Sequence, residues 1–401
     1  MGKTLKWPFK KKLFFSMLSC IFVLLLLEVI FRFYFYIAYH QFHTTIYTQG
    51  SPLQVSDSIT GFKNTPYYLD YNRNYQNNEE GFKSFPGDIS IPEKKANDFW
   101  VLLLGGSAME GMGSNKDGEW LDITGVGNHP ASESIAYKLQ LLLQAKLPGK
   151  NVKVFNAAAS SYVFWQSMQK YMQLRKKMAV DWVISMDGNN EIPSIGENFD
   201  IKMSIQEDWQ QRPIFKAPSK YIIPVTQHSF FLNSLKQSIY DTKYNVRMTN
   251  NRKSNFPACT YWLNKAPLPI KLAAEDKGIN RAIGFYMNTL KEFDSLLTQS
   301  HTKHLLVFQP FLFDKEYQLM DSVEKALYSY YTWNYNEATR NRFIKELKKI
   351  LLEKEKADEQ FLVIKPGNIK TGLFVDYCHF TRSGIDSISG IFASVILKSL
   401  K

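Results

Sequence analysis

A serine, a histidine and an aspartate in this chain have the types and the spacing needed for nucleophilic chemistry. Asp376 stands three residues before His379. At this spacing the carboxylate can reach the imidazole Nδ1–H within one turn, which fixes the tautomer and leaves Nε2 free to take a proton from a serine hydroxyl. Ser107, which follows the apolar run 99–104, is the candidate serine. Together these residues indicate acyl chemistry at a serine.

Three short apolar runs are expected to bring these groups to one edge of a parallel sheet. The run 99–104 is bounded by glycines, and a sharp turn would leave Ser107 at the carboxyl end of the strand. The run 152–160 ends in small residues, where a backbone N–H can face a ligand. The run 181–186 leads to Asn190, whose amide can donate a hydrogen bond to a developing oxyanion. Open α/β sheets place their sites at this edge.

Four blocks of the sequence resemble those of the SGNH (GDSL-like) hydrolase family and stand in the same order. They are Gly105-Gly106-Ser107, Asn156-Ala157-Ala158, Asp187-Gly188-Asn189-Asn190-Glu191 and Asp376-Tyr377-Cys378-His379. The resemblance covers about residues 95–400. It implies an α/β fold: a three-layer, flavodoxin-like parallel sheet with helices on both faces. Two positions depart from the family pattern, with Glu191 in place of Asp and Ala158 in place of Gly.

The resemblance also implies a role for five residues. Ser107 would be the nucleophile, His379 the base and Asp376 the carboxylate that orients the base. The oxyanion hole would consist of the Ser107 and Ala158 backbone N–H groups and the Asn190 side chain. No cofactor is implied, and no cluster in the sequence has the spacing of metal ligands.

Other residues of these blocks have simpler interpretations. Asp187 and Glu191 are expected to hold the Asn190 loop through hydrogen bonds. Asn156 can be structural or functional, and the sequence leaves both open. A Gly-Gly-Ser turn or a histidine near a helix start is common without catalysis, so the assignment depends on the four blocks occurring together.

The N-terminal region contains an apolar stretch long enough to cross a bilayer. Within residues 13–38 the only charges are Glu28 and Arg32, which are i,i+4 partners on a helix and can pair near the outer interface. Five lysines precede the stretch, and the next basic residue after Arg32 is Lys63. This asymmetry predicts a cytoplasmic N-terminus and a domain outside the cytoplasm. A cleaved signal peptide is the alternative, but the bulky residues after Leu27 favour an uncut anchor.

Composition and charge narrow the possible partners. The 401 residues carry a net charge of +12, and five of the lysines lie ahead of the anchor. The remaining charge is scattered, so no nucleic-acid partner is expected, whereas the basic tail suits anionic lipid head groups. We expect four parts: a cytoplasmic tail (1–12), a transmembrane anchor (13–38), an extracytoplasmic stem (39–94) and a hydrolase domain (95–401).

Periodicity predicts the remaining elements of that domain. Helices are expected at 130–147, 166–178, 276–300, 315–331, 336–355 and 381–400, and strands at 304–309 and 361–365. Strands that alternate with helices are typical of a parallel sheet covered on both faces.

One connection, 195–274, is too long for an ordinary loop and is rich in aromatic residues. It can be a subdomain with its own core, or a lid beside Asn190 whose rings stack on sugar faces. Cys259 within it could pair with Cys378, or Cys378 could remain a free thiol.

These observations predict a single-pass membrane protein with an extracytoplasmic serine esterase domain. Its substrate would be an acylated small molecule or carbohydrate, with an O-acetyl group on a sugar as one candidate. Two alternatives remain: an O-acyltransferase to a cell-surface polysaccharide, and a non-catalytic glycan-binding or assembly protein. The intact Ser107, Asp376 and His379 argue against the last of these.

Overall fold

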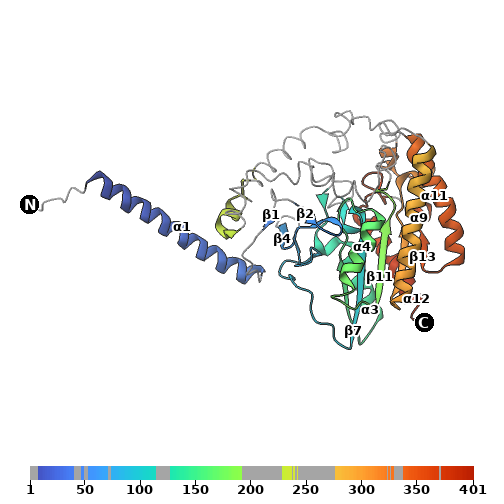
Figure 1. Cartoon of the computed structure of the whole chain (residues 1–401), viewed down its shortest axis with the longest axis horizontal. Coiled ribbons are helices and arrows are strands. Elements are labelled where there is room, and N and C mark those ends of the chain that lie inside the picture. Colours follow the sequence, from blue (N-terminus) through green and yellow to red (C-terminus); the bar gives the residue numbers. More distant parts are fainter. Residues whose placement is uncertain are drawn as a thin grey trace, which may run out of the picture.

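A computed structural model describes most of the chain (Figure 1). The described residues are 8–39, 47–48, 53–70, 74–113, 127–191, 228–236, 238–239, 242, 276–322, 324–325, 327–328, 337–369 and 372–401. Among them, one helix is long and apolar enough to cross a membrane, α1 (Phe9–Tyr39). It projects from the rest of the molecule (Figure 1).

The centre of the fold is a parallel sheet with the expected strands. β10 (Asn151–Asn156), β7 (Asp98–Gly105), β11 (Trp182–Asp187), β12 (Lys303–Phe308) and β13 (Phe361–Val363) lie side by side in that order. Every residue of β7 and β11 is buried, as expected for strands covered on both faces. The central position of β7 places the Ser107 turn between the loops that follow β10 and β11.

Helices cover both faces of the sheet, so the predicted three-layer α/β fold is confirmed. α4 (Phe164–Leu174), α9 (Asp276–Gln299) and α11 (Glu337–Ala357) share one apolar core with one face of the sheet. α3 (Ile135–Lys146) and α12 (Arg382–Lys398) share a second core on the other face. Two separate cores hold the strand ends rigidly, which a site built from several loops requires.

The described residues of the interval 39–94, which was expected to be a stem, are folded into the domain. β1 (Tyr47–Thr48), β4 (Tyr68–Asp70), β5 (Tyr75–Asn77) and β6 (Lys83–Ser84) extend the main sheet beyond β10, and β2 (Gln54–Asp57) pairs with β3 (Gly61–Asn64) in a hairpin. The sheet is therefore mixed, because β6 and β5 pair antiparallel with their neighbours. Phe62, Leu69 and Phe82 from this interval are buried. The boundary at residue 95 does not separate a stem from a domain.

One predicted helix, 315–331, begins later than expected. Residues 312–314 and 317–319 form short 3-10 turns, and helical residues start at Ser322. Asp321 explains the start, because its carboxylate accepts a hydrogen bond from the Glu324 N–H at 2.8 Å, as an N-cap does. Short pieces complete the described fold: α2 (Ser107–Glu110), β8 (Met112–Gly113), β9 (Gly127–Asn128) and 3-10 turns at Ala131–Glu133 and Pro366–Asn368.

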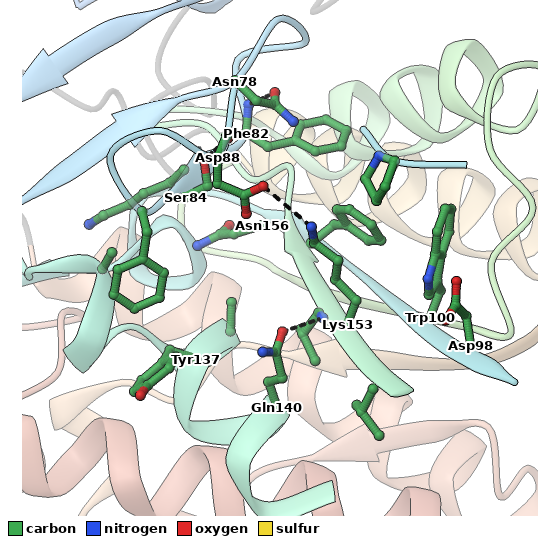
Figure 2. Close-up of a pocket in the computed structure, with 18 of the residues that line it drawn as sticks. Asn78, Phe82, Ser84, Asp88, Asp98, Trp100, Tyr137, Gln140, Lys153 and Asn156 are labelled. Atoms are coloured by element: carbon green, nitrogen blue, oxygen red, sulfur yellow. Dashed lines mark hydrogen bonds and ion pairs between the residues drawn. The ribbon is translucent and has the colours of Figure 1, made fainter. Parts of the chain in front are cut away.

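A cavity of about 450 Å³ lies along the outer edge of β10 (Figure 2). β6 pairs with β10 only at Asn156, so the N–H groups further down this edge need other acceptors. The side chains of Gln144 and Gln140 on α3 supply them, accepting from Val152 N–H at 2.9 Å and Val154 N–H at 3.0 Å. The cavity is lined by the outer edge of β10, where the Val152 and Val154 N–H groups already have acceptors. Ser107, Asp376 and His379 are not among its lining residues.

Candidate active site

Ser107 lies at the carboxyl end of the central strand, as predicted. It is the first residue of α2, directly after β7. The preceding turn needs glycine: Gly105 has φ +145°, and a Cβ there would collide with the carbonyl of Met186. The turn leaves the Ser107 side chain partly exposed above the sheet edge.

Ser107, His379 and Asp376 form one hydrogen-bonded chain. The Ser107 Oγ lies 2.7 Å from His379 Nε2, and His379 Nδ1 lies 2.6 Å from Asp376 Oδ2. Asp376 Oδ1 accepts hydrogen bonds from the backbone N–H groups of Cys378 (2.8 Å) and His379 (2.7 Å), which fix the carboxylate. With Nδ1–H donating to the carboxylate, Nε2 is left to accept the serine proton. The structure therefore brings the three predicted residues into one chain of hydrogen bonds.

The environment keeps the histidine strongly basic. Burial lowers the pKa of His379, but the Asp376 carboxylate and the neighbouring Cys378 outweigh it and leave this pKa well above the ordinary value. Burial raises the pKa of Asp376, yet His379 and the backbone hydrogen bonds hold it below its usual range. Asp376 therefore stays ionised, and a carboxylate in this position can stabilise a positive charge on His379.

This coupling predicts a pH dependence. His379 accepts a proton only when it is neutral, so kcat/KM should rise with pH through a pKa above that of an ordinary histidine. Asp376→Asn removes the charge that raises this pKa. The rising limb should then move to lower pH, and the plateau should fall roughly 10³- to 10⁴-fold. The matched variant Asp386→Asn changes an exposed carboxylate on α12 and should leave the limb in place. An unmoved limb in Asp376→Asn would show that Asp376 does not set the pKa of the base.

The Asn190 amide lies directly beside the nucleophile turn. Its Nδ2 donates to the Tyr162 carbonyl at 2.7 Å, which leaves the second N–H for a ligand. The approach depends on Gly106, because a Cβ on this residue would lie 2.5 Å from Asn190 Nδ2 and 3.3 Å from Tyr162 O. Asn190, Gly106 and the 159–162 turn therefore meet at one point next to Ser107.

The structure does not support Ala158 as an oxyanion donor. Its N–H donates to the Asn156 side-chain oxygen at 3.3 Å, and the residue is fully buried. Ser161 is another candidate donor, which the sequence did not indicate: it is exposed, has φ +68° and lies in the turn closed by the Tyr162 N–H to Ala159 O hydrogen bond. Within the described part of the chain, no protein atom accepts from the Ser161 N–H. Positive φ at a non-glycine residue is costly and concentrates at functional sites.

Comparisons with known proteins give only distant relatives. No protein-family model matches the sequence, and no curated protein matches it significantly. Among solved structures, a carbohydrate acetylesterase family member from Sinorhizobium meliloti is 12% identical with a TM-score of 0.32, covering 74% of this chain and 97% of that one. An acetylxylan esterase from Geobacillus stearothermophilus is 12% identical with a TM-score of 0.31, covering 76% and 96%. A two-domain esterase active on acetylated mannans is 10% identical with a TM-score of 0.30, covering 75% and 49%.

In this chain, the four blocks follow β7, β10, β11 and β13 at the carboxyl edge of the sheet. The fold is the three-layer α/β fold that the resemblance to the SGNH hydrolases implied. This arrangement explains why residues separated by up to 272 positions, Ser107 and His379, come within hydrogen-bond distance.

A buried carboxylate that the sequence analysis did not single out holds the segment after β10 in place. Glu110, on α2 one turn after Ser107, accepts a hydrogen bond from the Ser160 hydroxyl. The hairpin β2–β3 adds two more contacts to this segment, from Gln54 Nε2 to Ser160 O (2.8 Å) and from Asn64 Nδ2 to Ala158 O (3.0 Å). These contacts fix the turn that carries Ser161 relative to the nucleophile helix.

Asn156, whose role the sequence left open, has a structural role in the fold. Its Nδ2 lies 3.2 Å from the carbonyl oxygens of both Met109 and Glu110, at the end of α2. It therefore satisfies the last carbonyls of the nucleophile helix while its oxygen accepts from Ala158.

Asp187 and Glu191 hold the Asn190 loop through hydrogen bonds, as expected. Asp187 accepts from the hydroxyls of Ser167 (2.8 Å) and Ser185 (2.6 Å), and Glu191 accepts from the Phe164 N–H (2.6 Å). Burial raises the pKa of Asp187 to about 7 and that of Glu191 to about 8. The two acids tie the loop to α4 and flank the residue that bears the amide.

A buried ion pair between Lys315 and Glu324 supports the loop that carries Asp376 and His379. Glu324 Oε1 accepts from the Leu373 N–H at 2.9 Å, and its Oε2 lies 2.7 Å from Lys315 Nζ. Both charged side chains are fully buried. Removing one member would leave the other charge buried without its partner.

Glu324→Gln should therefore reduce stability strongly. We expect a loss of about 3–5 kcal/mol in the free energy of unfolding, because Lys315 would keep a buried charge opposite a neutral amide. Denaturant-induced unfolding of the full chain measures it. Glu346→Gln in the exposed Arg342–Glu346 pair is the matched control and should cost less than about 1 kcal/mol. Equal effects of the two substitutions would rule out a supporting role for the buried pair.

The sequence left two possibilities for Cys378, a disulfide with Cys259 or a free thiol. Cys378 is a buried free thiol in the structure, with its sulfur 3.5 Å from His379 Nδ1. Cys259 and nearly all of the connection 195–274 lie outside the described residues, apart from 228–236, 238–239 and 242.

Asp376, Cys378 and His379 are residue types that can bind a metal ion, and their ligand atoms lie within 4.8 Å of one another. Asp376 and His379 are, however, already hydrogen-bonded to each other.

Proposed function

We propose that this protein is a membrane-anchored serine esterase that hydrolyses O-acetyl groups on a carbohydrate. Ser107 attacks the ester carbonyl and passes its proton to His379, and the sugar hydroxyl leaves with that proton. Water then attacks the acetyl-serine, again giving its proton to His379, and acetate is released with the serine restored. The observation that carries the proposal is the relay of 2.7 and 2.6 Å from Ser107 through His379 to Asp376.

In this mechanism the tetrahedral oxyanion is held by three donors. They are the backbone N–H groups of Ser107 and Ser161 and the side-chain amide of Asn190. Ser161 replaces Ala158 in this role, because the Ala158 N–H already has an acceptor whereas Ser161 lies in the strained turn beside Gly106. Donors fixed before the reaction are worth most where charge develops.

The same proposal places the catalytic domain outside the cytoplasm, with α1 retained as an anchor. The end of α1 is packed against the domain: Phe35 is 1% exposed and lies in a cluster with Leu69 and Phe230. A signal peptide that is removed has no need of such contacts, so they support retention. Mass spectrometry of the mature N-terminus tests this, because a chain that begins after residue 38 would exclude an anchor.

Two features of the sequence support a carbohydrate as the substrate. An outward-facing membrane tether brings the site to the cell surface, and the 195–274 connection has many aromatic residues of the kind that stack on sugars. An acyltransferase uses the same acyl-enzyme, with a sugar hydroxyl in place of water in the second step. A non-catalytic glycan-binding protein would have no need of a complete relay.

Following the acetyl group separates these possibilities. The enzyme is given an activated acetyl ester with and without an acceptor oligosaccharide, and free acetate and acetylated sugar are measured. We expect acetate at the same rate in both cases. Acetyl transferred to the sugar with little acetate would establish the transferase, and no Ser107-dependent turnover, with no labelling of Ser107 by a fluorophosphonate, would exclude both enzymes.

A further inference from the structure

The charged residues inside the apolar helix α1 have a partner in the domain. Glu28 accepts three hydrogen bonds from the segment that starts at residue 228: from Ser229 Oγ at 2.7 Å and from the Phe230 and Phe231 N–H groups at 3.1 Å each. These N–H groups open a helical stretch, Phe230–Lys236, so Glu28 satisfies donors that the stretch itself cannot. We name residues 228–236, 238 and 239 the docked segment.

Arg32 completes this junction. Its Nε pairs with Glu28 Oε1 at 2.8 Å, its Nη2 donates to His228 O at 2.8 Å, and its guanidinium lies 4.9 Å from the centre of the Phe230 ring. Phe31 packs edge-on against Phe231, with ring centroids 5.6 Å apart. The docked segment (yellow) lies beside the end of α1 in Figure 1. Two charges in an apolar helix are thus bonded to one short segment.

The positions of Glu28 and Arg32 along α1 determine how deep the junction would lie when α1 crosses a bilayer. The hydrocarbon core of a bilayer is about 30 Å thick, which a helix crosses in about 20 residues. Counted from Lys12, the last lysine of the basic tail, this length ends near Arg32. Glu28 is one turn further inside, and the docked segment is bonded to it. With α1 across a bilayer and the domain outside the cytoplasm, the start of the docked segment would therefore lie at the boundary between head groups and acyl chains of the outer leaflet.

The surface around the junction is apolar. A groove of about 600 Å³ between α1 and the docked segment is lined by Ile21, Leu24 and Leu25 on one side and Phe231 and Leu232 on the other. Ile21, Leu24 and Leu25 belong to the apolar span of α1. When α1 crosses a bilayer, the groove is therefore filled by the same hydrocarbon that surrounds α1.

The apolar surface continues along the docked segment, away from α1. Phe231, Leu235 and Ile239 recur every four residues and so share one side of a helix. Leu235 is 48% exposed and Ile239 is 51% exposed. A stripe that begins against the anchor and continues exposed is typical of a helix lying in the membrane interface.

We propose that the docked segment is a second membrane contact, inserted into the outer leaflet with lipid acyl chains in the groove and held to the anchor by Glu28 and Arg32. The domain is then attached to the bilayer at two places and cannot rotate freely about α1. This inference goes beyond the esterase activity, and it rests on α1 remaining in the bilayer.

Fluorescence quenching by lipid tests the contact. The full chain, with Cys20 and Cys259 replaced by alanine, is placed in phosphatidylcholine–phosphatidylglycerol vesicles whose acyl chains carry a nitroxide at carbon 5. A small environment-sensitive fluorophore is attached through Leu235→Cys or Ile239→Cys. Both side chains are exposed, so the label has room. Leu141→Cys on α3 is the matched control, at 49% exposure, and Leu24→Cys in the span is the positive control.

We expect the fluorophores at 235 and 239 to lose fluorescence to an extent comparable with position 24, and the one at 141 to keep it. Adding Glu28→Ala should reduce the loss at 235 and 239 and leave that at 24 unchanged. Quenching at 24 together with values at 235 and 239 like that at 141 would overturn the second contact alone. No quenching at 24 would overturn the anchor and the inference together. Ester turnover plays no part in this readout, so the enzymatic proposal is tested separately.

Discussion

Replacing Ser107 by alanine should lower the turnover of an acetyl ester roughly 10⁴- to 10⁶-fold while the protein stays folded. In the proposed mechanism the Ser107 Oγ forms the acyl-enzyme, and this atom lies 2.7 Å from Nε2 of the proposed base, His379. Only the oxyanion donors would then act on the substrate. Initial rates with an activated acetyl ester, and the loss of fluorophosphonate labelling at residue 107, measure the effect.

The relay should behave as one unit. His379→Ala should cost about as much as Ser107→Ala, and the double variant should be little worse than either, because each substitution alone stops the proton transfer. Ser387→Ala is a matched control, since this serine is partly exposed on α12 and its hydroxyl bonds to Ser383 O within its own helix. Turnover that survives Ser107→Ala at the wild-type rate would remove the serine from the mechanism.

Gly106→Ala should reduce kcat roughly 10²- to 10³-fold with little change in KM. The backbone of Gly106 has φ −84°, which alanine adopts without strain, so the effect comes from the new methyl group. That methyl would lie 2.5 Å from Asn190 Nδ2 and would push the amide away from the oxyanion. The amide stabilises charge that exists only in the transition state, and kcat is therefore the affected constant.

A double-substitution cycle shows whether Gly106 acts through Asn190. Asn190→Ala alone should lose about 2.7–4 kcal/mol of transition-state stabilisation, and adding Gly106→Ala should then cost little more, because the colliding amide is gone. Gly284→Ala and Gly390→Ala are controls, since a Cβ at either meets no atom within 4 Å. Two independent, additive losses would mean that the methyl group acts on something other than the amide.

The sequence was sufficient for the relay and for the central sheet. Asp376 and His379 are three residues apart, so their contact depends on local geometry that the sequence specifies. Ser107 follows a run of buried residues whose burial on both faces is visible as continuous apolar character. The predicted positions of strands and of most helices followed from the same patterns.

Ser161, the donor proposed in place of Ala158, could not be found in the same way. The sequence does not indicate that the Asn156 side chain accepts a hydrogen bond from the Ala158 N–H. It does not indicate either that Ser161 has a positive φ. Both depend on contacts with α2 and the β2–β3 hairpin, which are far away in sequence. The Asn64 contact with Ala158, for example, spans 94 positions.

The short strands between residues 47 and 84 were missed for a different reason. They are two to four residues long, and all three residues of β4 and of β5 are buried, so they give no alternation of polar and apolar side chains. Burial of polar residues such as Asp70 and Gln76 removes the remaining signal.

The packing of the β2–β3 hairpin against residues 158–166 limits how this enzyme could be shortened or released from the cell. Tyr162 OH donates to Phe62 O at 2.8 Å, and Gln166 Nε2 bonds Thr60 O across the same boundary. A protease that cut at residue 95 and removed everything before it would take away the support of the oxyanion turn and four strands of the sheet. Shedding of an active, soluble enzyme is therefore open only to a cut between α1 and Gln54. The β2–β3 hairpin therefore supports the turn beside Ser107 and does more than connect α1 to the domain.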